Sequence, residues 1–231
     1  MGIRERSKQK RRNRILITAR GLIVDEGVAG LSMRALADGA EVSVATLYNL
    51  LGSKEEILYA LLDQSYDTLD MSAAAVTEGD SIARAELIVS VAAKQFLSDA
   101  DFYKRLLRGI QGIESGERAS KSILKIWALA ERVVADGMSD GLLRNSLPPR
   151  LIAQMILASY SGAMRNWVIG RIDNETFMAQ VRLGLVMSLL SVATDETRPR
   201  LELRADELGT QVLQSHSLAG ATATTRDDAV A

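Results

Sequence analysis

Residues 42–54 read VSVATLYNLLGSK, and this stretch decides how the first part of the chain folds. Ser43 is a favourable N-cap, because its hydroxyl can accept an orphan backbone N–H of the first helical turn. Gly52 is the residue type preferred just past a helix end. Ser53 and Glu56 have the spacing of a capping box, so a second helix is predicted to start at once. The pattern predicts a short helix between Ser43 and Gly52 that can present its polar side chains outward.

A second short helix is predicted just upstream, with Ser32 as its N-cap and Gly39 at the start of the following turn. Leu36 and Ala37 would face inward. Helix, tight turn and helix form the helix-turn-helix plan, in which the second helix lies in the DNA major groove and the first crosses the phosphate backbone. The sequence therefore predicts a helix-turn-helix over about residues 32–52.

Four short segments at ungapped spacing carry a resemblance to a known family. They are Gly30-Leu31-Ser32, Leu36-Ala37, Val42-Ser43-x-x-Thr46-Leu47-Tyr48 and Ser53-Lys54-Glu55. Together they look like the N-terminal domain of the TetR family of bacterial transcriptional regulators, over roughly residues 10–62. Glu41 stands where the family usually has Gly, and a positive φ would strain it. The rest of the chain resembles the family only in its helical plan.

The matched motif implies which side chains contact DNA. By position, the candidates for base edges are Arg34, Val44, Ala45 and Asn49. Arg can pair with guanine and Asn with adenine, while small apolar groups can touch a thymine methyl. Hydroxyls and an ammonium group are expected at phosphates, from Thr46, Tyr48 and Lys54. The full DNA-binding set is Ser32, Arg34, Ser43, Val44, Ala45, Thr46, Tyr48, Asn49 and Lys54.

A net charge of −1 hides an asymmetry along the chain. Residues 1–54 hold ten Lys or Arg and five Asp or Glu, whereas the remainder holds 18 basic and 24 acidic residues. A basic N-terminal module on an acidic body indicates a polyanion partner at one end only. Seven basic residues fall within residues 1–14. Beside a helix-turn-helix they favour a flexible arm that follows DNA over a merely solvated tail.

The composition predicts an all-α protein. Leu, Ala, Arg and Glu are frequent, only three prolines occur among 231 residues, and alternating strand patterns are hard to find. We expect an N-terminal three-helix helix-turn-helix domain joined to a larger C-terminal helical domain for ligand binding and dimerisation. The expected boundaries are a basic flexible arm at 1–10, the DNA-binding domain at 11–71 with its recognition helix at about 44–51, the helical body at 72–197, and an extension at 198–231 that is disordered from Ser215.

Catalytic and membrane signals are weak. The chain has no cysteine, and its only histidine, His216, lies in the expected disordered tail, so a Ser-His-Asp or Cys-His site is excluded as normally built. We expect no enzyme activity, no metal and no cofactor. The longest apolar run, 177–193, is too short and too polar for a membrane span, and no apolar segment of a signal peptide follows the basic N-terminus. The chain is expected in the cytoplasm, and on the nucleoid when bound to DNA.

Bulky apolar residues on the body helices are candidates for an effector pocket, although plain core packing is the commoner role of each one. They are Phe96, Phe102, Leu106, Ile110, Trp127, Met138, Tyr160, Met164 and Trp167. The helix expected at 173–193 is apolar on nearly all sides, which favours contact with a second chain over a wholly internal core. The candidate dimer residues, from this helix and the preceding one, are Ala158, Ser159, Gly162, Val181, Leu185 and Ser188.

These patterns together predict a homodimeric regulator of transcription, most simply a repressor. It would bind a palindromic operator in double-stranded DNA and be released by an apolar or aromatic small molecule. Two alternatives stay open: an effector-independent or architectural DNA-binding protein, and an all-helical enzyme with a vestigial DNA module. A fully packed body would favour the first alternative, and failure to bind any DNA would favour the second.

Overall fold

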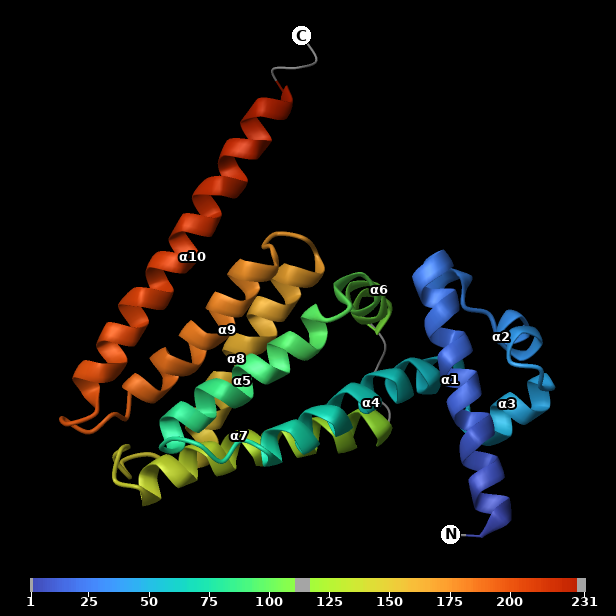
Figure 1. Ribbon diagram of the computed structural model, residues 1–231, viewed down its shortest axis with the longest axis horizontal. Coiled ribbons are helices and arrows are strands. Elements are labelled where there is room, and N and C mark those ends of the chain that lie inside the picture. Colours follow the sequence, from blue (N-terminus) through green and yellow to red (C-terminus); the bar gives the residue numbers. More distant parts are fainter. Residues whose placement is uncertain (1, 111–116, 228–231) are drawn as a thin grey trace. The chain divides into compact units, whose positions relative to one another are not determined.

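The computed structural model describes residues 2–110 and 117–227, and the fold they form is all-α, as predicted. Figure 1 shows the order of the helices along the chain. Their bounds are α1 Ile3–Gly30, α2 Met33–Gly39, α3 Val44–Leu51, α4 Lys54–Ala74, α5 Ser81–Leu97, α6 Ala100–Ile110, α7 Glu117–Ser139, α8 Pro149–Val168, α9 Asn174–Leu190 and α10 Arg198–Asp227. No helix of the described residues is long and apolar enough to cross a membrane.

The chain divides into two compact units that do not coincide with the expected boundary near residue 71. The N-terminal unit comprises Met1–Thr68 and Ser98–Ile123, and the C-terminal unit comprises Leu69–Leu97 and Leu124–Ala231. Helix α6 therefore belongs with the first helices rather than with the body. Periodicity within a segment gives no information on which distant helix that segment packs against, so the sequence could not place α6.

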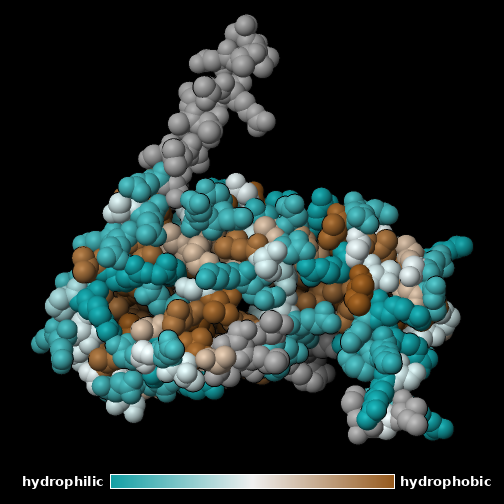
Figure 2. Space-filling model, in the orientation of Figure 1, coloured by the Kyte–Doolittle hydropathy of each residue, from teal (hydrophilic) through white to brown (hydrophobic). Residues whose placement is uncertain are grey.

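Helix α1 includes the segment at 1–10 that was expected to be a flexible arm. It begins at Ile3, so the basic residues of the first 14 positions lie on its opening turns, which Figure 2 shows as hydrophilic surface. These positions lack Gly and Pro after residue 2 and are rich in Arg, Lys, Glu and Gln, which are strong helix formers. Ile15, Ala19 and Ile23 are fully buried. The helix is interrupted at Gly27, whose φ of 73° is non-helical.

Helix α6 is fastened to α1 by charge and ring contacts. Arg20 pairs with Asp99 at 2.5 Å, and its guanidinium lies 4.0 Å from the centroid of the Phe102 ring. Asp99 also caps α6 by accepting the backbone N–H of Phe102. The buried hydroxyls of Ser65 on α4 and Tyr103 on α6 are hydrogen-bonded at 2.8 Å. The N-terminal unit is thus a helix-turn-helix supported by α1, the first part of α4 and α6.

The C-terminal unit packs around α9, which contacts α5, α8 and α10. Its core draws buried side chains from several of these helices, namely Ile82, Ala85, Val134, Leu143, Ile152, Ile156, Leu185, Val186, Leu189, Val192, Ala193, Leu201 and Leu208. Figure 2 shows apolar patches among the polar side chains on the visible face of the molecule.

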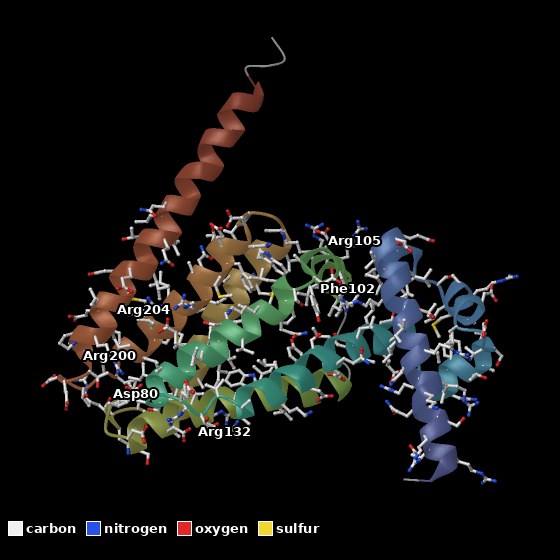
Figure 3. All side chains as sticks on the ribbon, in the orientation of Figure 1. Asp80, Phe102, Arg105, Arg132, Arg200 and Arg204 are labelled. Atoms are coloured by element: carbon white, nitrogen blue, oxygen red, sulfur yellow. The ribbon has the colours of Figure 1, made fainter. Side chains whose placement is uncertain are left out.

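Helix α10 occupies most of the C-terminal extension that was expected at 198–231. It runs to Asp227, so the backbone is helical where disorder was expected from Ser215. Leu201 and Leu208 are buried against the body. Arg200 pairs with Asp80 at 2.5 Å (Figure 3), and Arg204 and Arg182 both donate to Oε1 of Glu86. The sequence showed the charges of this segment but not their distant partners, Asp80 just before α5 and Glu86 on α5.

Candidate nucleic-acid interface

Helix α2 begins and packs as the sequence predicts. The Ser32 hydroxyl accepts the backbone N–H of Ala35 at 3.1 Å, which makes Ser32 the N-cap. Leu36 and Ala37 are buried, while Arg34 is exposed. This short helix is therefore anchored by its inner face and leaves its only arginine in solvent.

The turn between α2 and α3 contains a strained residue. Glu41 has a φ of 53°, which is the left-handed region expected for a Gly at this place. An L-residue pays roughly 1–2 kcal/mol there. Arg14 of α1 contacts this turn twice: Nη1 lies 3.5 Å from Oε2 of Glu41, and Nη2 donates to its backbone carbonyl at 3.5 Å. Both side chains are largely exposed, so the ion pair contributes little stability.

Helix α3 spans 44–51, as the sequence predicts, and has one anchored face and one exposed face. Ser43 caps it by accepting the backbone N–H of Thr46 at 3.1 Å. Leu47 and Leu51 are 0% and 1% exposed and hold the helix to the unit. Its other face carries exposed side chains, those of Val44, Ala45, Tyr48 and Asn49. Their spacing of one, four and five residues from Val44 places them on one side of the helix.

The junction between α3 and α4 is closed by predicted caps and by one bond that was not predicted. Gly52 has a φ of 85° and ends α3. The Ser53 backbone N–H donates to Oε2 of Glu56 at 2.8 Å, and the Glu56 N–H donates to the Ser53 hydroxyl, which confirms the capping box. Lys54 instead turns inward: its ammonium donates to the backbone carbonyl of Val28 at 2.7 Å.

Most of the predicted DNA-binding set lies in solvent in this structure. Ser32, Arg34, Ser43, Val44, Ala45, Tyr48 and Asn49 are exposed, and Thr46 is half-buried beside its cap. Lys54 differs, since its ammonium already has a partner within the protein. Sequence reasoning missed a further contact, from Arg12 to α3. Counting basic residues treats all seven N-terminal cations alike and contains no signal for this long-range bond.

The anchored α2 and α3, with the exposed outer face of α3, have the arrangement of a helix-turn-helix. The sequence profile described as "Bacterial regulatory proteins, tetR family" matches residues 15–61. The N-terminal helix-turn-helix module is similar to this family over these residues.

Individual relatives agree with this assignment. The HTH-type transcriptional repressor KstR of Rhodococcus jostii is 25% identical over 134 residues, 58% of this chain and 62% of KstR. The match thus spans less than two thirds of that repressor. The regulator EthR of Mycobacterium tuberculosis is 28% identical over 162 residues, 64% of this chain and 74% of EthR. Both relatives are regulators of transcription.

A solved structure shows the same fold. SmeT, the repressor of a multidrug efflux pump in Stenotrophomonas maltophilia, superposes with a TM-score of 0.63 at 18% identity. The superposition covers 80% of this chain and 92% of SmeT. At this identity the likeness supports the all-α architecture and nothing finer.

The candidate effector residues fall in both units. Phe102, Leu106 and Ile110 lie on α6 in the N-terminal unit, where the first two are buried. The others, all in the C-terminal unit, are Phe96, Trp127, Met138, Tyr160, Met164 and Trp167. Trp167 is fully buried, stacks on Phe177 with ring centroids 5.0 Å apart, and donates its indole N–H to Asn174. Tyr160 meets the same Phe177 ring edge-on. Trp167 therefore has a core-packing role that joins α8 to α9.

The candidate dimer residues separate into two groups. Val181 and Leu185 are each 2% exposed within the single chain, because α5, α8 and α10 surround α9. These two residues are therefore buried without a second chain, and a place for them in a dimer interface stays a prediction. Ser159 also faces inward, since a Cβ on Gly184 of α9 would contact its side chain, and Ser188 donates to the carbonyl of Gly184. Ala158 is exposed, and a Cβ on Gly162 would meet nothing within 4 Å.

Proposed function

We propose that this chain is a transcriptional repressor that binds a palindromic DNA operator as a homodimer in the bacterial cytoplasm. The observation that supports it most is the exposed face of α3. Tyr48 and Asn49 are exposed there, while Leu47 and Leu51 fix the opposite face. A helix held in this way can enter a major groove with its polar side chains leading. Asn49 and Arg34 are the proposed base readers, with Thr46 and Tyr48 at phosphates.

The proposed dimer surface is the outer face of α8. Leu151 is 47% exposed and Met155 60% exposed, and Ala158 and Gly162 continue the same stripe at helical spacing. A second copy of the chain is the proposed occupant, because one recognition helix reads too few bases to find a single genomic site. Pairing two modules makes the second contact intramolecular and raises specificity.

The proposed effector is an apolar or aromatic small molecule that acts through α6. Three of the candidate side chains belong to this helix, and α6 packs directly on the end of α1. There Gly109 lies against Val28, whose carbonyl holds Lys54 at the start of α4. A small shift of α6 would be transmitted through Gly109, Val28 and Lys54 to the junction at which α3 ends. Release needs the effector to prefer one state by about 1–3 kcal/mol of coupling.

Selection of binding sites from fragmented genomic DNA with the purified chain tests the DNA-binding part. We expect an enriched palindrome whose half-sites lie about one or two helical turns apart. The matched control is a Tyr48→Ala/Asn49→Ala variant, which keeps both buried leucines and should fold normally. Retention of no DNA by the folded parent protein, or equal enrichment by parent and control, would contradict the proposal.

A further inference from the structure

Arg12 differs from its basic neighbours on α1 in where its side chain ends. Its Nη1 donates to the backbone carbonyl of Leu50 at 3.1 Å, in a part-buried setting. Leu50 is the penultimate residue of α3, so this carbonyl is among the last four, which lack a partner within the helix. A cation at this position also interacts favourably with the negative end of the helix dipole. Arg12 therefore caps the C-terminal end of the recognition helix from another helix.

The opposite end of α3 is contacted by the same stretch of α1. Arg14 donates to the backbone carbonyl of Glu41 at 3.5 Å, and Glu41 lies two residues before the N-cap Ser43. The two arginines thus contact both flanks of an eight-residue helix. The remaining basic residues of these turns, Arg4, Arg6, Lys8, Lys10 and Arg11, are exposed.

We propose that Arg12 is a positioning residue for DNA reading, which fixes the direction in which α3 projects from α1, and that it is not a phosphate ligand. The inference rests on the proposed reading role of α3. Two buried leucines alone leave a short helix free to tilt about its anchored face. A recognition site loses function when its groups move by about 0.5 Å or 10–20°. The bond from Arg12 to Leu50 restrains that tilt at the end that leads into α4.

Hydrogen exchange in the DNA-free protein tests the restraint separately from DNA binding. The variants are Arg12→Met, which removes the donors but keeps a long side chain, and Arg12→Lys, which keeps one donor group. Arg11→Met is the matched control, because it loses the same charge from an exposed neighbour. We expect amides of residues 48–52 to exchange about tenfold faster in Arg12→Met, with α2 unchanged. Arg12→Lys should restore most of the protection, and Arg11→Met should match the parent.

The second measurement is DNA affinity across a series of salt concentrations, with the duplex that selection by the parent protein returns and a scrambled duplex. For Arg12→Met we expect a loss of about tenfold on the selected duplex, a smaller loss on the scrambled one, and an unchanged salt slope. Unchanged exchange together with a slope lower by about one unit would identify Arg12 as a phosphate ligand and overturn the inference. If the parent selects no DNA, the proposed function fails, whereas the exchange result still decides whether Arg12 restrains α3.

Discussion

Gly109 of α6 lies against Val28 of α1 so closely that a Cβ on residue 109 would come within 2.5 Å of Cγ2 of Val28. The next two nearest atoms, Cγ1 and Cβ of the same valine, would be 2.6 and 2.8 Å away. A β-branched side chain has little rotamer freedom with which to avoid such an overlap. Any added methyl must therefore shift α1 and α6 relative to each other at this contact, and Val28 is also the residue whose carbonyl holds Lys54.

Gly109→Ala should consequently weaken DNA binding without any effector. The methyl pushes Val28 outward, and the displaced carbonyl carries Lys54 and the start of α4 with it. We expect a loss of operator affinity of about 1–3 kcal/mol, the usual range of allosteric coupling. Fluorescence anisotropy with the selected duplex measures it.

A Val28→Ala/Gly109→Ala double variant is the control for that prediction, because it removes the two nearest atoms that the new side chain would meet and leaves only the Cβ of residue 28 in close contact. Its affinity should return to within about twofold of the affinity of Val28→Ala alone. Equal losses in the single and double variants would show that α6 does not act on α3 through Val28.

Lys54→Met should weaken DNA binding with an unchanged salt slope. The Lys54 ammonium donates to the Val28 carbonyl within the protein. Its removal should therefore loosen the junction between α3 and α4 but leave unchanged the number of counterions that the protein releases from DNA on binding. The sequence motif alone predicts a phosphate contact, for which the slope would fall by about one unit. Titrations over a salt series separate the two roles.

Asn49→Ala should relax base preference at one symmetric pair of operator positions. Asn pairs in a bidentate manner with adenine, and loss of such a contact removes about 1–3 kcal/mol of discrimination per half-site. Selection repeated with the variant measures the change. If parent and variant enrich the same motif with the same information at every position, Asn49 does not read a base.

Met155→Glu and Leu185→Glu should have different effects, because Met155 is exposed on the surface of α8 whereas Leu185 is buried in the core. Met155 is 60% exposed on the outer face of α8, so a carboxylate there should dissociate the dimer and leave the fold intact. Leu185 is 2% exposed in the core, where an unpaired charge costs several kcal/mol and should unfold the unit. Ultracentrifugation and circular dichroism report assembly and fold. A dimeric Met155→Glu variant would exclude this face of α8.

Asp80→Asn should make the C-terminal unit less sensitive to acid. Burial raises the pKa of Asp80, but the bonds and charge from Arg200 and the amide of Ala83 outweigh burial and hold the pKa below its ordinary value of 3.8. A lowered pKa in the folded state contributes stability above the ordinary value, and this stability is lost as the pH falls through the lowered pKa. Denaturant midpoints between about pH 5 and pH 3 should therefore fall less in the variant. Asp136→Asn, on an exposed side chain of α7, is the charge control and should behave as the parent.

The bounds of α2, α3 and the start of α4 could be predicted from the sequence, because they depend on helix caps. The caps at Ser32 and Ser43, the capping box at Ser53 and the stop at Gly52 depend on residues three or four positions apart, and the structure confirms each one. Interactions at this range can be predicted from the spacing of the residues in the sequence. The recognition helix could therefore be bounded from the sequence.

Contacts between distant segments were not predictable in the same way. Nothing near Arg12 in the sequence indicates Leu50 as its partner, and nothing near Arg204 indicates Glu86. Nothing near Leu201 and Leu208 in the sequence indicates the distant helices against which these two residues of α10 are buried.

The place of α6 matters for exchanging parts between regulators. A chimera that joins the first 71 residues to a foreign ligand-binding body would omit Ser98–Ile123, which fold with Met1–Thr68. Arg20 would lose its contacts with the Asp99 carboxylate and the Phe102 ring, and Val28 would lose its contact with Gly109. The transferable DNA-reading part is therefore discontinuous in the gene, and a working graft has to move two segments together.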